Sequence, residues 1–377
     1  MTLPFEIVLW IFMIISLIYI IVISIITYGW FTLKGHFIPK TMPNTKVSVV
    51  IAVRNEEKNI EALLNSLVSQ SYPKEMMEVV IVDDHSDDET PFIIMEFVKL
   101  NSGLSIRLHL SESTGKKAAI RQGVEIARNN FIITTDGDCL PHKQWVRKMA
   151  AYYELHKPKI VLGPVVYHSE QNFVQKLFSL DFISLVVSGA GSVGAGLPFM
   201  GNAANMAFEK ESYLKANLKT AYTSGDDVFL IHSVKKQFGS SSIHFIKDAR
   251  ALVRTEPPKN LSSFITQRIR WASKAKGYSN FWAITVSWTV ALLNLSSALM
   301  FVAGMLWPWM LAIWILFITL KTLIDFPLLN SYAQLTGKSN LLIYILPMEF
   351  IYPFYIVAAG FGSLFFPYRW KGRNGLQ

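Results

Sequence analysis

Two acidic motifs in this chain could do chemistry, and each follows directly on an apolar run. Val79 to Val82 leads into Asp83 and Asp84, and Phe131 to Thr135 leads into Asp136-Gly137-Asp138. Carboxylates on either side of a permissive glycine could place two hard oxygen ligands on one divalent cation. Magnesium takes one or two protein carboxylates and completes its shell with phosphate and water, so such a site implies a nucleotide diphosphate substrate. The alternative for either motif alone is turn chemistry, because Asp and Gly favour tight turns and helix caps.

Alternating strands and helices are expected to position these motifs. Apolar runs at 47–53, 79–82, 105–110 and 131–135 predict strands, and 57–70, a segment opened by Pro91, and 116–127 predict helices. This alternation is typical of an α/β domain with a mostly parallel, Rossmann-like sheet. Ligands of such sheets bind beyond the carboxyl ends of the strands, so both motifs should lie at one edge.

The ends of the chain carry apolar stretches of membrane-spanning length. Ile7 to Ile26 contains no charged residue, and a helix of that length spans about 30 Å, the thickness of a hydrocarbon core. A cleaved signal peptide is the alternative, but the start is not basic and no small-residue cleavage site follows. Three further stretches cover 281–304, 306–329 and 341–366. The last contains Pro347, Glu349 and Pro353, which predicts a kinked, re-entrant or split segment.

Flanking bases give the expected orientation. Lys34, Lys40 and Lys46 follow the first span, which places residues 32–280 in the cytoplasm by the positive-inside rule. The tail bases Arg369, Lys371 and Arg373 should also be cytoplasmic, which requires that the Pro-broken last stretch does not cross fully. The expected organisation is an N-terminal anchor (1–31), a cytoplasmic catalytic domain (46–255), an interfacial segment (256–280), a C-terminal membrane region (281–366) and a basic tail (367–377). The expected location is a bacterial inner membrane.

Composition excludes several classes of protein. Hydrophobic residues make up 51% and charged residues 17%, which excludes a disordered chain. The net charge of +9 fits contact with anionic membrane lipids or a polyanionic substrate. We find no helix-turn-helix, zinc or RNA-binding signature, so nucleic acid is not an expected partner. The single cysteine, Cys139, excludes an intramolecular disulfide.

A series of short motifs occurs along residues 46–275: 47–51, 54–57, Asp83-Asp84, Gly115-Lys116 with Ala119 and Gly123, Asp136-Gly-Asp138, 201–208, 225–230 and Gln-x-x-Arg-Trp at 267–271. With these motifs in this order, the chain resembles family 2 glycosyltransferases. The resemblance is closest to the membrane-bound branch that includes poly-N-acetylglucosamine, cellulose and hyaluronan synthases and ceramide glucosyltransferase. It implies a GT-A fold with transmembrane helices at both ends.

The resemblance also implies residue roles. Asp227 would be the general base, although Asp226 replaces the usual Glu before it and leaves open which of the two takes the proton. Asp138, with Asp136, would hold Mg²⁺ or Mn²⁺. The remaining assignments are nucleotide contacts by Glu56, Asp83, Asp84, Lys116 and Asp136, and acceptor or diphosphate contacts by Gln267, Arg270 and Trp271.

The chemistry supports this division. A carboxylate can take the acceptor hydroxyl's proton, and a metal with a fixed guanidinium can stabilise the leaving diphosphate. For Lys116 and Lys117 the alternative is a solvated helix start. The expected reaction is inverting transfer from a nucleotide-diphosphate sugar, with UDP as the expected nucleotide, to a lipid-linked or polysaccharide acceptor, which forms a β-glycosidic bond. A polymer product would need a partner for export.

The sequence also disfavours two other functions, and three further segments have alternative interpretations. A catalytically silent nucleotide-sugar sensor would typically lose the base or Trp271, and a transporter would need more intramembrane charge than Lys321, Asp325 and Glu349. Gly189 to Gly194 matches the dinucleotide fingerprint but does not open the first strand–helix unit, so a loop near the membrane is expected. Residues 171–187 predict a helix in the core or, preferably, in the membrane interface. The basic segment 267–278, with Arg268, Lys274 and Lys276, could also bind lipid headgroups.

Overall fold

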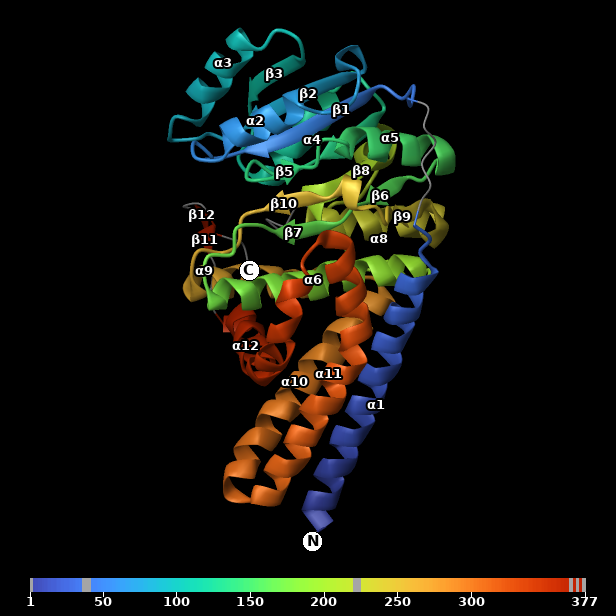
Figure 1. Cartoon of the computed structure of the whole chain (residues 1–377), viewed down its shortest axis with the longest axis vertical. Coiled ribbons are helices and arrows are strands. Elements are labelled where there is room, and N and C mark those ends of the chain that lie inside the picture. Colours follow the sequence, from blue (N-terminus) through green and yellow to red (C-terminus); the bar gives the residue numbers. More distant parts are fainter. Residues whose placement is uncertain (1–2, 36–41, 220–224, 366–368, 371–372, 375–377) are drawn as a thin grey trace.

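The structure is a computed structural model that describes residues 3–35, 42–219, 225–365, 369–370 and 373–374. The sheets and their helices form one end of an elongated molecule, and long helices form the other (Figure 1). Lys40 and Lys371, which entered the orientation argument, lie outside the described residues.

The main sheet has seven strands in the order β3-β2-β1-β4-β8-β6-β9. Strands β3, β2, β1 and β4 are parallel, and β8 runs antiparallel to both β4 and β6. The predicted mostly parallel α/β sheet is therefore confirmed. The bounds are β1 (Val47–Val53), β2 (Met77–Asp83), β3 (Ser105–Leu110), β4 (Phe131–Thr134), β6 (Ile160–Leu162), β8 (Met206–Glu209) and β9 (Ile243–Phe245). A second sheet joins β5 (Leu140–Pro141), β10 (Val253–Thr255) and β7 (Val165–Tyr167).

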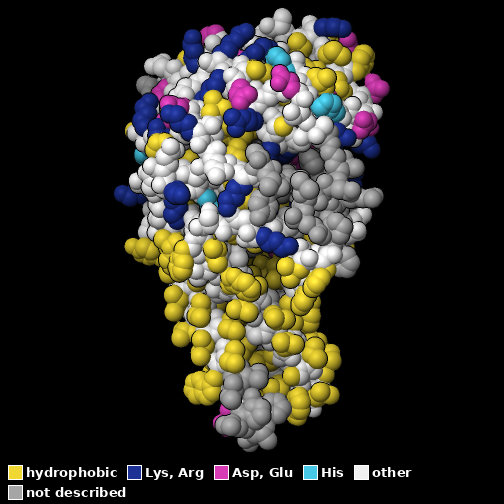
Figure 2. All heavy atoms as spheres, turned by 180° about the vertical axis from the view of Figure 1, so that it is seen from behind, with side chains coloured by type: hydrophobic (Ala, Val, Ile, Leu, Met, Phe, Trp, Pro, Cys, Tyr) yellow, Lys and Arg dark blue, Asp and Glu magenta, His cyan; other side chains and the backbone are white. Residues whose placement is uncertain are grey.

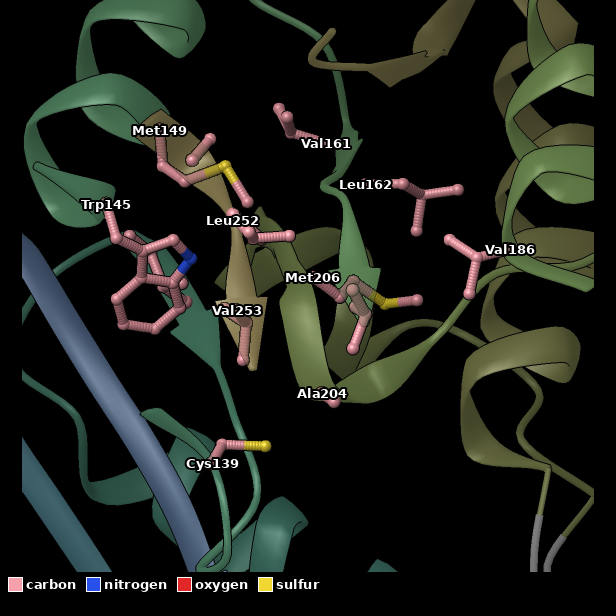
Figure 3. Close-up of a cluster of buried hydrophobic side chains, with 14 of the residues drawn as sticks. Cys139, Trp145, Met149, Val161, Leu162, Val186, Ala204, Met206, Leu252 and Val253 are labelled. Atoms are coloured by element: carbon pink, nitrogen blue, oxygen red, sulfur yellow. The ribbon is translucent and has the colours of Figure 1, made fainter. Parts of the chain in front are cut away.

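Helices cover the sheet because its central strands are apolar on both faces, as in other parallel sheets. Helix α4 approaches β1 closely at Gly123, where a Cβ would lie 2.5 Å from Cγ1 of Val50. Figure 3 shows part of the core, in which Trp145, Met149, Met206 and Leu252 gather between α5 and nearby strands. The helices are α2 (Ile60–Val68), α3 (Thr90–Leu100), α4 (Lys116–Ile126), α5 (Trp145–His156), α7 (Lys210–Leu214) and α8 (Asp226–Phe238).

Five helices in the described part of the chain are long and apolar enough to cross a membrane. Hydrophobic side chains gather over the end of the molecule that these helices form, whereas charged side chains gather over the sheet end (Figure 2). Helices α1, α10 and α11 run side by side, and α6 crosses beneath the second sheet (Figure 1). The bounds are α1 (Leu3–Thr32), α6 (Phe173–Gly194), α10 (Phe281–Leu306), α11 (Pro308–Thr336) and α12 (Ile345–Phe365), which a 3₁₀ turn precedes at Ser339–Tyr344.

The last apolar stretch, expected to be kinked, re-entrant or split, consists of the 3₁₀ turn at Ser339–Tyr344 and the helix α12, which contains Pro353. It lies below α9 (Leu261–Ser273) and does not reach the far end of the α1–α10–α11 bundle (Figure 1). The glycine-rich segment Gly189 to Gly194 is not a loop, because it forms the last turns of α6.

These glycines let α6 and α1 pack backbone against backbone. A Cβ at Gly194 would lie 1.9 Å from the carbonyl oxygen of Gly29, and a Cβ at Gly191 would lie 2.3 Å from that of Ile26. Such small residues allow close helix approach. Most of α6, including Leu180 and Ile183, is buried against the rest of the protein. Of the two alternatives for this segment, its burial matches the core helix.

A polar cluster lies buried between α1, α11 and α12. The Lys321 ammonium donates to Oδ2 of Asp325 at 2.7 Å and to both carboxylate oxygens of Glu349 at 2.9 and 2.7 Å. The Tyr19 hydroxyl donates to Asp325 at 2.7 Å. Each charged group of this cluster therefore has a partner within it, as charges in an apolar setting require.

Candidate active site

The acidic pair at the end of β2 is built into the local backbone. Asp83 accepts hydrogen bonds from the amide and hydroxyl of Ser86, the amide at 3.1 Å. Asp84 accepts from the amide of Gly115 at 2.8 Å, and Gly115 precedes α4 with a φ of +111° that favours glycine. Asp84 thus ties the end of β2 to the start of α4, whereas Asp83 stabilises its own loop.

The loop after β1 lies against the Asp136-Gly137-Asp138 loop. A Cβ at Gly137 would lie 2.8 Å from Cγ of Glu56, so only glycine admits Glu56 at this distance. The Arg54 guanidinium donates to the carbonyl oxygen of Asp84 at 2.7 Å. The loops after β1, β2 and β4 therefore meet at one edge of the sheet, as their positions after the strands predict.

Asp136 pairs with the first residue of α4. The Lys116 ammonium lies 2.6 Å from Oδ1 of Asp136. Burial lowers the pKa of Lys116, but the charges of Asp136 and Asp226 outweigh it and raise the pKa above its ordinary value, against the opposing charge of Arg270. Lys116 is therefore a partly exposed first residue of α4 that lies among charged groups from three other segments.

Asp226 and Asp227 begin α8, after Gly225 with a φ of +93°. Oδ1 of Asp227 accepts from the amide of Val228 at 2.8 Å and lies 3.7 Å from the Lys274 ammonium. A helix N-terminus stabilises negative charge, and so does a nearby ammonium. Both contacts hold the Asp227 carboxylate at the start of α8.

A pocket of about 320 Å³ joins these groups. It brings together Asp136, Asp226, Asp227 and Lys116, whereas Glu56, Asp83, Asp84 and Asp138 are not among its lining residues. The lining residues are Lys116, Ile120, Thr134, Thr135, Asp136, Ala203, Met206, Phe208, Tyr213, Asp226, Asp227 and Leu230.

Comparison with known proteins decides the family. The model of glycosyl transferase family 2 matches residues 48–241, which is half of the chain. The chain belongs to glycosyl transferase family 2. The prediction of a glycosyltransferase is thereby confirmed at the level of the family, and the finer branch is treated below as a proposal.

Relatives and a solved structure agree with this family. The chain is 40% identical over 102 residues to glycosyltransferase AglE of Haloferax volcanii, in a match that covers 27% of this chain and 33% of AglE. It is 24% identical over 200 residues to dolichyl N-acetyl-alpha-D-glucosaminyl phosphate 3-beta-D-2,3-diacetamido-2,3-dideoxy-beta-D-glucuronosyltransferase of Methanococcus voltae, which covers 51% of this chain and 62% of that protein. The matches thus span one third to three fifths of these relatives.

The solved structure shows that the likeness of fold extends beyond the sheet domain. The mannosyltransferase PcManGT of Pyrobaculum calidifontis, solved with GDP-Man and Mn²⁺, aligns with a TM-score of 0.62 and 18% identity over 95% of this chain and 97% of its own. At this identity the likeness shows the fold alone, and it confirms the predicted GT-A fold.

The carboxylates of this family 2 domain fit a metal site in which the protein supplies only a few of the ligands. Among the described residues no group of three or more His, Cys, Asp and Glu side chains could hold an ion. Asp136 and Asp138 would therefore supply at most two carboxylates, and phosphate and water would supply the rest, as Mg²⁺ and Mn²⁺ accept.

The Gln-x-x-Arg-Trp motif lies on α9, and its residues have different surroundings. Oε1 of Gln267 accepts from Arg268 at 2.7 Å and from the Tyr167 hydroxyl at 3.3 Å. The Arg268 guanidinium stacks 4.4 Å from the Trp271 ring, so one face of that ring is already in contact with protein. Arg270 is near enough to Lys116 to influence its pKa. Arg270 is thus the member of the motif whose charge reaches the pocket.

Sequence reasoning missed two residues at this site. Tyr213 lines the pocket, and its buried hydroxyl has no hydrogen-bond partner among the described residues. Burial and the charge of Asp226 raise the pKa of this hydroxyl, which keeps it a neutral donor. Lys274 approaches Asp227, although its sequence context indicated lipid headgroups. No local signal marks either residue, because both reach the site through contacts between distant segments.

Proposed function

We propose that this chain is an inverting, metal-dependent membrane glycosyltransferase. It would transfer a sugar from a nucleotide diphosphate to a lipid-linked or polysaccharide acceptor and form a β-glycosidic bond. The observation that carries the proposal is the pocket in which Asp136, Asp226, Asp227 and Lys116 meet beside the carboxyl ends of the strands.

Asp227 is the proposed general base. In an inverting transfer the acceptor hydroxyl attacks the anomeric carbon, the bond to the diphosphate breaks, and the hydroxyl proton passes to a carboxylate within hydrogen-bond reach. The start of α8 and Lys274 hold the Asp227 carboxylate beside the pocket. Asp226 is the alternative, and it lies nearer the charges around Lys116.

Lys116 and Arg270 are the proposed contacts for the leaving diphosphate. Negative charge develops there as the glycosidic bond breaks, and fixed cations stabilise it. A bound Mg²⁺ or Mn²⁺ held by Asp136 and Asp138 would supply further charge neutralisation. Gln267 and Trp271 would line the acceptor side of the pocket.

The donor is proposed to be UDP-linked, with Glu56, Asp83 and Asp84 near the nucleoside. These residues gather where the loops after β1 and β2 meet. Because PcManGT was solved with GDP-Man, GDP-sugars belong in the same test.

The acceptor side is proposed to be the membrane, with the domain in the cytoplasm. Five apolar helices support insertion, and α12 stops short of the bundle, as an incomplete last crossing would require. Three helices side by side are few for a polysaccharide channel, which favours a lipid-linked acceptor over the polymer-making branch. A polymer product would need a separate export partner.

The test is Asp227→Asn in the full chain. We expect kcat to fall about 10²–10⁴-fold while affinity for the nucleotide is unchanged, because only proton transfer is lost. Membranes would be incubated with radiolabelled UDP- and GDP-sugars, and lipid and polymer products would then be separated. Glu96→Gln, on an exposed part of α3, is the matched control. Unaltered turnover in Asp227→Asn would transfer the base role to Asp226.

A further inference from the structure

Arg268 is a buried cation within the Gln-x-x-Arg-Trp segment, and the proposed function gives it no task. Its side chain on α9 is 6% exposed, and that of its partner Asp181 on α6 is 1% exposed. The guanidinium donates to Oδ2 of Asp181 from Nε at 2.8 Å and also from Nη2. A planar guanidinium that makes two such bonds is fixed in direction as well as in position.

The Asp181 carboxylate connects three helices. Its Oδ1 accepts from the hydroxyl of Tyr355 on α12, while its Oδ2 accepts from Arg268 on α9. All three side chains are buried. Helix α12 also approaches α9 at Gly362, where a Cβ would lie 2.7 Å from Cδ1 of Ile269. Helices α6 and α12 together therefore support α9.

Arg268 also contacts two residues of the motif directly. Its Nη1 donates to Oε1 of Gln267 at 2.7 Å, and the Tyr167 hydroxyl donates to the same oxygen at 3.3 Å. Its Cζ atom lies 4.4 Å from the ring centroid of Phe264 and 4.4 Å from that of Trp271. Trp271 thus packs against a cation whose own position is fixed by the carboxylate on α6.

The spacing along α9 separates the contacts of its two motif arginines. Gln267, Arg270 and Trp271 are three and four residues apart and so share one face of the helix. Arg268 follows Gln267 by one residue, about 100° around the helix. The charge of Arg270 reaches Lys116 at the pocket, whereas Arg268 pairs with α6. The two arginines therefore have different neighbours.

Holding α6 and α9 together does not by itself require this network. Buried ion pairs contribute little net stability, and apolar side chains of similar volume often replace them without loss. An apolar replacement would, however, lose the donor to Gln267 and the flat cationic group beside Trp271. The network therefore matches a need for orientation better than a need for cohesion.

We propose that Arg268 is a positioning residue for the acceptor side of the site. The carboxylate on α6, itself bound by Tyr355, holds the guanidinium, which in turn orients Gln267 and Trp271. The inference rests on the proposed function for the acceptor side, but the orientation of Trp271 can be measured without turnover. If the acceptor side is misplaced, water attacks the anomeric carbon in place of the acceptor hydroxyl. The nucleotide diphosphate leaves in both reactions, so free sugar replaces transferred sugar.

Two variants of the full chain separate orientation from cohesion. Arg268→Lys keeps a cation for Asp181 but has neither the planar fork nor the flat face. Arg268→Met/Asp181→Leu removes both charges, so that no charge is left buried alone. The control is Lys148→Met/Asp248→Leu, which replaces another buried ion pair, with both side chains 7% exposed, whose residues do not line the pocket.

The first measurement follows radiolabelled sugar from UDP- and GDP-sugars into membrane products and into free sugar, with UDP affinity measured in parallel. In both Arg268 variants we expect the ratio of transferred to free sugar to fall about tenfold or more, while UDP affinity is unchanged. The control should keep the wild-type ratio even if its unfolding temperature falls. A wild-type ratio in either Arg268 variant would overturn the inference, and Arg268→Lys alone decides if the double variant does not fold.

The second measurement is ¹⁹F NMR of the full chain labelled with 5-fluorotryptophan, in which Trp271→Phe identifies the Trp271 resonance. We expect this resonance to shift in both Arg268 variants and to stay in place in the control. Tyr355→Phe removes a donor that bonds to Asp181 and not to Trp271, and it should cause a smaller shift. An unmoved resonance in Tyr355→Phe or in the Arg268 variants would overturn the inference. If wild-type membranes transfer no sugar, the proposed function fails, and the resonance still decides whether Arg268 orients Trp271.

Discussion

Two clusters of lysine and carboxylate in this chain use the same side chains in different surroundings. In the sheet domain, Lys116 and Asp136 pair at 2.6 Å with side chains 26% and 33% exposed. Between α1, α11 and α12, Lys321 pairs with Asp325 and Glu349 at 2.7 Å, and these side chains are 6%, 10% and 8% exposed. The first pair opens onto a pocket, whereas the second is enclosed by helices.

The difference shows that residue type alone does not make a binding site. A group in a partly exposed pair can exchange its partner for a ligand at little cost, because water solvates each charge while the pair is broken. An enclosed pair cannot, since a charge left alone in apolar surroundings keeps its full desolvation penalty. The enclosed cluster is therefore a structural link between three helices, and the Lys116–Asp136 pair belongs to the candidate site.

The largest expected effect breaks the enclosed cluster. Lys321→Met leaves Asp325 and Glu349 buried without a cation, and we expect the free energy of unfolding to fall by about 3–5 kcal/mol. Lys116→Met, the matched change in the open cluster, should cost no more than about 1 kcal/mol. Unfolding of both variants in detergent, followed by far-UV circular dichroism, measures the contrast. Equal losses in the two variants would show that the distinction between the clusters is wrong.

A smaller effect is expected at Asp138, the proposed metal ligand beside the open cluster. Asp138→Ala should weaken metal-dependent UDP binding by about 1.5–3 kcal/mol, because a charged ligand of the ion is lost, and should leave the unfolding temperature almost unchanged. Calorimetric titration of UDP with and without Mn²⁺ separates the two contributions. Full UDP affinity with Mn²⁺ present would remove Asp138 from the metal site.

A further effect concerns a buried histidine on α8, outside both clusters. Burial lowers the pKa of His232 on α8 to about 4, although its hydrogen bond to the carbonyl oxygen of Phe199 raises it; the charges of Lys235 and Lys219 lower it further. The unfolded chain binds a proton near pH 6.5, so stability from neutral His232 is complete above that pH and is lost as the pH falls toward 4. Between pH 7 and pH 5 the loss should be about 2 kcal/mol.

The check on His232 compares the wild type with His232→Gln at both pH values. The amide of Gln can donate to the same carbonyl but does not titrate, so the variant should lose less stability on acidification. Identical pH dependence in the two proteins would assign the acid sensitivity to other groups.

The sequence predicted the parts of the site that follow strands. The apolar runs before Asp83 and Asp136 could be recognised locally, and the order of the parallel strands then brought their loops together. The expected helix over 57–70 is shorter, at Ile60–Val68, because Glu56 and Asn59 form a turn before it. Such boundaries depend on loop contacts that no local pattern contains.

Contacts between distant segments could not be predicted. Lys274 and Asp227 are far apart in sequence and meet only because the turn after α9 brings the Lys274 side chain to the start of α8. The glycines at 189–194 matched a nucleotide motif, yet their function in the fold is close packing against α1. The sequence contained the small residues but did not show which backbone would fill the space beside them.

The backbone contact between α1 and α6 also fixes the position of the sheet domain along the first helix. With Gly29 against Gly194 and no side chain between the helices, the sheet domain has little freedom to tilt or rise relative to the first helix. If the long helices are embedded as proposed, the catalytic carboxylates stand at a constant distance above the bilayer surface. Such an enzyme would use only those acceptors whose reactive hydroxyl projects from the membrane by that distance.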